Sequence, residues 1–214
     1  MVSKHTDQPS RAGSLSLIGE AIALDFANTS SGRGGPERLD HLREPEDVVA
    51  WAEHVGIIAA DTAARIRKRL KGRTFAALLA DALALREAIY RVAVAIAAGK
   101  APPHEDLTAI KSACARAIGA SDLAPRSDGF RWTWPVDPPV PETILGPIAL
   151  SAAGLLREGD LSRIKQCAGE HCGWLFFDLT KNKSRRWCDM AVCGNRMKGR
   201  RHRSRLPMRA TEEP

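Results

Sequence analysis

Four of the five cysteines fall into two matched pairs near the C-terminal end of the chain. Each pair encloses four residues and fifteen residues separate the pairs, so the spacing is C-x4-C-x15-C-x4-C. Two loops that each offer two thiolates can meet on one tetrahedral metal ion, and Cys₄ is a common set of ligands for structural Zn²⁺. The spacing therefore predicts one zinc site, with four ligands: Cys167, Cys172, Cys188 and Cys193.

Other interpretations of the cysteines are weaker. An iron–sulfur cluster is the main competitor for four thiolates. Disulfides are disfavoured because residues 1–13 are polar and contain no apolar stretch of a secretion signal, which predicts an intracellular protein. His171 is a rival ligand, but four thiolates already fill a tetrahedral site and leave no position for water, so we expect a structural ion. Cys114 lies on an apolar helical face and is expected to be a small buried hydrophobe.

Positive charge is concentrated around and after these cysteines. The chain carries +7 in total: residues 181–209 carry +10, residues 1–180 carry −1, and Glu212 and Glu213 carry −2. A basic segment braced by zinc suits a polyanion, because arginine contacts phosphates and can also pair with guanine. We favour a nucleic-acid partner over a solvated or protein-binding face. The candidate contacts are Arg185, Arg186, Asn195, Arg196, Lys198, Arg200, Arg201 and Arg203.

The chain as a whole has the composition of a globular protein. Over 214 residues, 44% are hydrophobic and 27% charged, which excludes a mini-protein and a globally disordered chain. No apolar stretch reaches the ~18 residues of a membrane span. Apolar periodicity and the capping residues predict helices over residues 45–56, 61–70, 74–98, 107–119 and 146–158.

Strands are expected in three places. Residues 15–29 alternate apolar and polar side chains, as do residues 130–134, and these two segments could pair. A hairpin is predicted between the cysteine pairs, from residues 173–179 and 185–187, followed by a helix after Cys193. The predicted fold is α+β: a mostly helical body with a small sheet over residues 15–159, then a basic, treble-clef-like Cys₄ finger over residues 160–206.

Few residues of the body indicate chemistry. Asp25 and Asn28 are the polar residues to watch: each either caps a turn or contacts a ligand or the finger. The sequence contains no Gly-rich phosphate loop and no convincing nucleophile–base pair, so no catalytic residues are predicted and the protein is not expected to be an enzyme.

The cysteine segment resembles a known family. The tetrapeptide Cys193-Gly194-Asn195-Arg196, the Arg-Arg-Trp-Cys run before Cys188 and the basic exit are similar to the CGNR zinc finger. The run GEAIALDFANT and the stretch through Trp51 resemble the ABATE domain, which precedes such fingers and is described as part of stress-induced transcriptional regulators. Together the two resemblances cover nearly the whole chain.

The resemblance implies a bacterial, zinc-dependent, DNA-binding transcription regulator in the cytoplasm, associated with the nucleoid. Its N-terminal domain would sense a small-molecule effector or form a homodimer, and no membrane partner is expected. An RNA-binding protein is the alternative, with aromatic residues as stacking surfaces beside the basic ones: Trp174, Phe176, Phe177 and Trp187. A weaker alternative is an enzyme whose body holds a pocket while the finger is structural.

Overall fold

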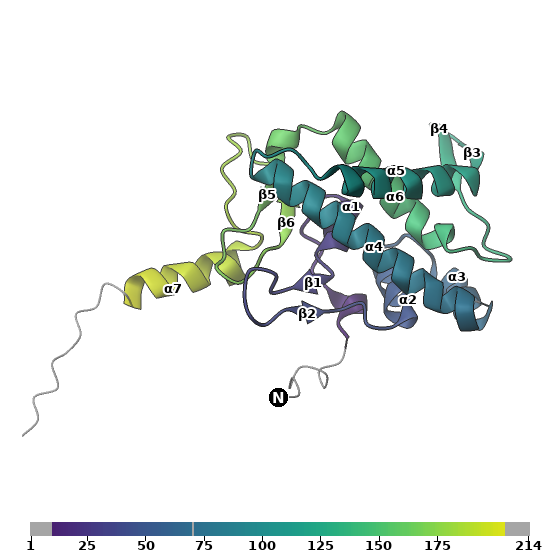
Figure 1. Ribbon diagram of the computed structural model, residues 1–214, viewed down its shortest axis with the longest axis horizontal. Coiled ribbons are helices and arrows are strands. Elements are labelled where there is room, and N and C mark those ends of the chain that lie inside the picture. The colour runs from purple at the N-terminus through teal and green to yellow at the C-terminus, as the bar shows by residue number, and fades with distance from the viewer. Residues whose placement is uncertain (1–9, 70, 204–214) are drawn as a thin grey trace, which may run out of the picture.

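The fold is mostly helical, with three separate two-stranded antiparallel sheets. It is known from a computed structural model that describes residues 10–69 and 71–203, with side chains up to Arg200. Figure 1 shows the long helix α4 running through the body, with α5 and α6 along it and α7 projecting away from the rest. The predicted α+β class is confirmed.

The five predicted body helices are present. They are α2 (Pro45–His54), α3 (Ala60–Arg69), α4 (Gly72–Ala97), α5 (His104–Gly119) and α6 (Glu142–Glu158). Helix α2 begins with a proline and a capping box between Glu44 and Asp47, which satisfies free N–H groups of its first turn. Helix α4 buries Leu78, Leu85 and Ile89 at helical spacing, and this stripe faces the core.

The strand predicted within residues 15–29 is wrong, because Ile22–Ala27 forms the short helix α1. Ala23, Leu24 and Phe26 are all fully buried, so α1 is covered on almost every side by the core. A helix buried all round lacks the 3.6-residue pattern that distinguishes helices from strands. Short strands follow it, β1 (Ser30–Ser31) and β2 (Leu39–Asp40).

The expected pairing between the segments around Leu24 and Trp132 is also wrong. Strand β4 (Gly129–Thr133) is where the alternation of Phe130 and Trp132 predicts it, but its partner is the adjacent strand β3 (Asp122–Arg126). Pro125 lies inside β3, and proline weakens the sequence signal of a strand because it has no N–H group. The sheet is therefore a local hairpin at the far end of α5.

The hairpin predicted between the two cysteine pairs differs in its first strand. Strand β6 (Leu175–Phe177) bonds to β5 (Ile164–Gln166), which precedes the first cysteine, and residues 185–187 form no strand. The hairpin thus encloses the first cysteine pair instead of following it. The second pair leads through the turn η3 (Met190–Gly194) into α7 (Asn195–Arg203), the helix that the sequence predicts.

The hydrophobic core continues from the body into the finger. Ile164 of β5 and Leu175 of β6 are buried in the same cluster as Leu24 of α1 and Ile89 of α4. Core packing crosses the domain boundary predicted between residues 159 and 160, and that boundary stays a prediction. Within residues 10–69 and 71–203, no helix combines the length and the apolar character needed to cross a membrane.

Candidate metal centre and nucleic-acid interface

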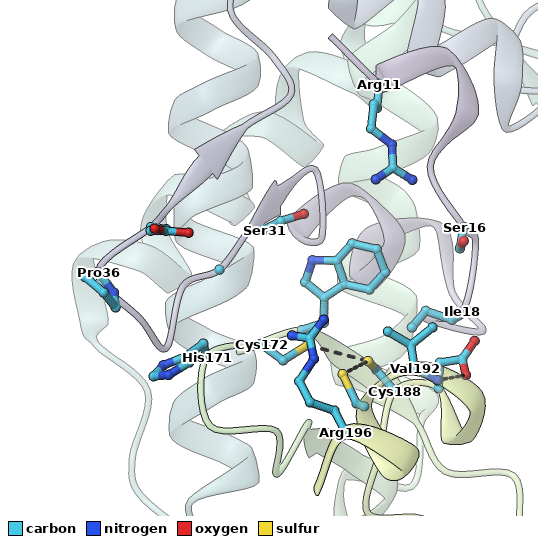
Figure 2. Close-up of a pocket in the computed structure, with 15 residues that line it drawn as sticks. Arg11, Ser16, Ile18, Ser31, Pro36, His171, Cys172, Cys188, Val192 and Arg196 are labelled. Carbon is cyan, nitrogen blue, oxygen red and sulfur yellow. Dashed lines mark hydrogen bonds between the residues drawn. The ribbon is translucent and has the colours of Figure 1, made fainter. Parts of the chain in front are cut away.

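The two cysteine pairs converge at one point. The first knuckle, residues 167–172, is the loop between β5 and β6, and the second knuckle, residues 188–193, enters α7. All four sulfur atoms lie within 4.8 Å of one another, and the Sγ of Cys188 is 3.5 Å from those of Cys172 and Cys193 (Figure 2). Sulfurs bound tetrahedrally at ~2.3 Å from zinc are about 3.8 Å apart, so this set can hold one structural zinc ion.

Backbone groups around the sulfurs also suit thiolates. The N–H of Cys188 and that of Gly169 donate to the Sγ of Cys167 at 3.3 and 3.4 Å. Asp189 accepts a hydrogen bond from the Val192 N–H and so caps the turn that carries Cys193. Donors aimed at sulfur offset part of the negative charge that four thiolates leave on a zinc ion.

The sulfurs do not lose their protons equally without a metal. Hydrogen bonds from Cys172 and Cys188 lower the pKa of Cys167, because they stabilise its thiolate. The same bonds keep protons on the donors, so the pKa of Cys172 is raised to about 12 by its bond to Cys167. Zinc binding must therefore release protons, which makes zinc affinity fall as the pH falls.

A glycine-rich loop of the body lies directly against the first knuckle. A Cβ atom on Gly35 would come within 2.8 Å of the Cβ of His171, and one on Gly173 within 2.9 Å of the Cβ of Arg33. Gly173 also has φ +71°, a conformation that favours glycine. Only glycine allows this close approach, so the loop of residues 32–37 fixes the finger against the body.

Arg33 and Tyr90 continue this junction into α4. The Arg33 guanidinium lies 3.9 Å from the centroid of the Tyr90 ring and makes two hydrogen bonds to Glu87. The Tyr90 hydroxyl donates to the Gly173 carbonyl at 3.1 Å and accepts from Gln166 at 3.0 Å. Burial alone would raise the pKa of Glu87, but Arg33 and two neighbouring arginines outweigh it and lower that pKa to about 2.

The sequence did not single out this junction. Arg33 lies in a Gly-rich segment that predicts only a turn, and Tyr90 lies in a segment that predicts only a helix. The sequence around each residue therefore does not indicate that the two side chains meet. Asp178 was missed as well. It is fully buried and accepts hydrogen bonds from the N–H groups of Thr180 and Arg185, which orders the loop between β6 and the second knuckle.

Asp25 and Asn28 make internal hydrogen bonds. The Asn28 amide donates to the Leu175 carbonyl and accepts from the Leu175 N–H, each at 2.8 Å, and is buried. Asp25 accepts hydrogen bonds from the N–H groups of Ile18 and Gly19. These bonds lower the pKa of Asp25, but burial raises it by more, so the pKa is raised overall. Both residues hold the finger or the segment beside it. Ligand binding at Asp25 and Asn28 stays a prediction.

Arg185 has an internal role in the finger. Its guanidinium lies 4.3 Å from the Phe176 ring centroid and donates to the carbonyl oxygens of Trp187 and Cys188. Arg186 is exposed, and its guanidinium is 5.6 Å from the centroid of the Trp187 ring. Of these two predicted contacts, Arg186 is therefore the one that faces outward.

Helix α7 presents the remaining predicted contacts. Asn195, Arg196 and Lys198 are exposed on its first turns, and Arg200 is exposed and paired with Glu170 of the first knuckle. The side chains of Arg201 and Arg203 lie outside the described residues. The aromatic residues proposed for stacking on RNA are less open, because Phe176 is fully buried and Trp174, Phe177 and Trp187 are half-buried.

Comparison with known families agrees with this geometry. Residues 20–159 match the ABATE family, described as "Putative stress-induced transcription regulator", and residues 163–206 match the CGNR zinc finger. A comparison with curated proteins gives no significant match. The resemblances seen in the sequence are confirmed in the same order along the chain. The chain belongs to the ABATE family and carries a CGNR zinc finger after its ABATE domain.

Proposed function

We propose that this protein is a cytoplasmic transcription regulator that binds duplex DNA through its zinc-braced helix α7. The observation that carries the proposal is the position of α7: Asn195 begins the helix two residues after Cys193, and the helix projects from the body (Figure 1). Zinc at the four sulfurs would fix the orientation of the base of α7. A rigid helix is the element that the major groove, about 12 Å wide, admits.

The charges on this face suit DNA. Arg196 and Lys198 are exposed cations on α7, and Arg186 is an exposed cation of the segment before the second knuckle. Such side chains contact phosphates and set the register on the duplex, while an arginine or Asn195 can contact base edges. The family description, a transcription regulator, favours this partner over a catalytic role.

The ABATE domain would receive the signal or bring two copies together. One helix contacts few base pairs, and regulators commonly gain specificity from two copies on adjacent half-sites. The body is joined to the finger by a common core and by the Arg33–Tyr90 junction, so a change in the body can reach α7 through packed residues.

The test is a fluorescence-anisotropy titration of the zinc-loaded full chain with random duplex DNA at several salt concentrations. We expect log K to fall steeply with log salt, by ~0.9 for each phosphate neutralised. Lys198→Gln and Arg186→Gln should each weaken binding and reduce that slope by about 1. Arg126→Gln, on the distant strand β3, is the matched control and should change neither quantity.

Two outcomes would contradict the proposal. The first is duplex DNA binding of equal strength in three variants: Lys198→Gln, Arg186→Gln and Arg126→Gln. That result would place the DNA contact away from α7. The other is preferential binding to single-stranded RNA, which would support the alternative partner. Zinc content is measured for every variant, so that loss of the metal is not mistaken for loss of a contact.

A further inference from the structure

The hairpin of β3 and β4 separates apolar from polar side chains. Leu123 lies directly opposite Trp132, and Pro125 lies directly opposite Phe130. Residues that are directly opposite share a face of the sheet, and so do residues two apart on one strand. These four side chains therefore lie together, and we call them the hairpin face.

The other side of the hairpin carries the charges. Asp122, Arg126 and Arg131 alternate with the residues of the hairpin face, so their side chains point the opposite way and are exposed. An antiparallel sheet with this alternation normally has its polar side in water and its apolar side covered by other residues. The pattern therefore indicates that the hairpin face is a surface to be covered.

The body covers only the base of the hairpin. Trp134 follows β4 and packs against α6, where a Cβ atom on Gly146 would come within 2.5 Å of its ring. Its indole N–H donates to the Ala117 carbonyl of α5 at 2.9 Å. Further from this anchor, Trp132 is 40% exposed and Phe130 is 73% exposed. The exposure of the aromatic side chains thus rises from the base of the hairpin towards its tip.

The uncovered hairpin face is a sizeable apolar patch. Leu123 is 56% exposed, and Pro125 is exposed as well. With the two aromatic residues they leave about 400 Å² of apolar surface in water, since one aromatic side chain alone has roughly 150–250 Å². The largest apolar patch of a typical monomer covers roughly 300–600 Å² and often marks an interaction site.

A second copy of the chain fits this patch. The hairpin face contains no charged side chain, so two copies can pack face to face about a two-fold axis without bringing like charges together. Two such faces would bury about 800 Å² of apolar surface. Ile118 and Val136 flank the hairpin in the chain and are exposed too. Their surfaces would bring the total to about 1,000 Å², the area that a specific interface needs.

We propose that the protein forms a homodimer through the hairpin face, with Phe130 and Trp132 of each chain at its centre. Figure 1 shows the hairpin at the opposite end of the molecule from α7, so both fingers stay accessible in such a dimer. The dimer would supply the second copy that binding to two half-sites needs, and that link rests on the proposed function. The dimer itself does not, because it can be measured without DNA.

The test is sedimentation velocity of the zinc-loaded full chain between about 1 and 500 µM. We expect the sedimentation coefficient to rise with concentration from that of a monomer to that of a dimer. Phe130→Asp should raise the dissociation constant of the dimer by about tenfold or more, because it replaces a central aromatic residue with a charge. Arg131→Asp is the matched control: it places the same carboxylate one residue along, on the opposite side of the hairpin, and should leave the dimer intact.

Both substitutions are at exposed positions, so both variants should fold and bind zinc as the natural chain does. Circular dichroism and metal analysis check this. Titration of the natural chain with random duplex DNA separates the two proposals. A dimer that binds no DNA supports the hairpin interface and contradicts the proposed function, whereas a chain that binds DNA and stays monomeric does the reverse.

Three results would overturn the hairpin interface. The first is a chain that is monomeric at every concentration, which would leave the hairpin face to a different protein. The second is a dimer that is as tight in Phe130→Asp as in the natural chain. The third is equal weakening of the dimer by Phe130→Asp and Arg131→Asp, since a contact through the hairpin face distinguishes the two sides of the hairpin.

Discussion

Asn28 does with its side chain what a strand residue does with its backbone. Its amide donates one hydrogen bond to Leu175 and accepts one from it, so strand β6 of the finger is paired on its outer side by the residue that follows α1. Both bonds are buried, where an unmatched N–H or carbonyl group is costly. One residue of the body therefore completes the hydrogen bonding of the finger's core strand.

Replacing Asn28 by alanine should destabilise the whole chain. The change leaves the N–H and the carbonyl of Leu175 without partners, and we expect the free energy of unfolding to fall by about 2–4 kcal/mol. Urea denaturation followed by circular dichroism measures this quantity. Asn195→Ala, at an exposed position of α7, is the matched control and should cost under about 1 kcal/mol. Equal losses in the two variants would show that the Asn28 bonds contribute nothing specific.

At the scale of elements, the first knuckle is held from three sides. The hairpin of β5 and β6 encloses it, the loop of residues 32–37 lies against it, and the second knuckle shares its sulfurs. A metal ion at the sulfurs would hold two of these elements together directly. The third element, the loop, belongs to the body, so loss of zinc should destabilise the body as well as the finger.

Cys188→Ser should lower both the zinc content and the thermal stability of the full chain. Three thiolates hold zinc less well than four, and the β5–β6 hairpin then loses its closure beside the core. Cys114→Ser is a matched control, because that cysteine lies on α5 and its thiol donates to the Ala149 carbonyl. Metal analysis and a thermal melt of both variants provide the comparison. Full zinc in Cys188→Ser would contradict the ligand assignment.

Local patterns were predictable from the sequence, and pairing at a distance was not. The cysteine set and the stripe of α4 lie in continuous segments, so spacing alone indicates them. The sequence of α1 predicts a strand because the core covers this helix on nearly all sides, which removes the helical periodicity. Sequence order favours the segment before Cys188 as the partner of β6, whereas the actual partner is β5, which precedes Cys167. The Arg33–Tyr90 junction depends on tertiary contacts, which leave no local pattern in the sequence.

At the scale of the molecule, body and finger are packed as one unit. Ile164 and Leu175 fill the core between α1 and α4, although both follow the predicted boundary at residue 159. Without them, the apolar sides of α1 and α4 would face water. Burial of each such side chain contributes roughly 1.5–3 kcal/mol, a sizeable part of the stability of an ordinary domain.

A chain that ends at Gly159 should therefore be less stable than one that ends at residue 206. We expect a lower melting temperature and stronger binding of a hydrophobic dye, because the surface under β5 and β6 is uncovered. Differential scanning fluorimetry of the two shortened chains makes the comparison. If the shorter chain melts cooperatively at the same temperature, then residues 15–159 form an independent domain, as the sequence predicts.

The chain contains a single tyrosine, and it stands at the contact between body and finger. Its hydroxyl bonds to Gly173 and Gln166, and burial raises the pKa of Tyr90. Fluorotyrosine introduced throughout the protein would thus give one ¹⁹F resonance, from this contact alone. This resonance would shift whenever zinc or DNA changes the contact between the body and the finger.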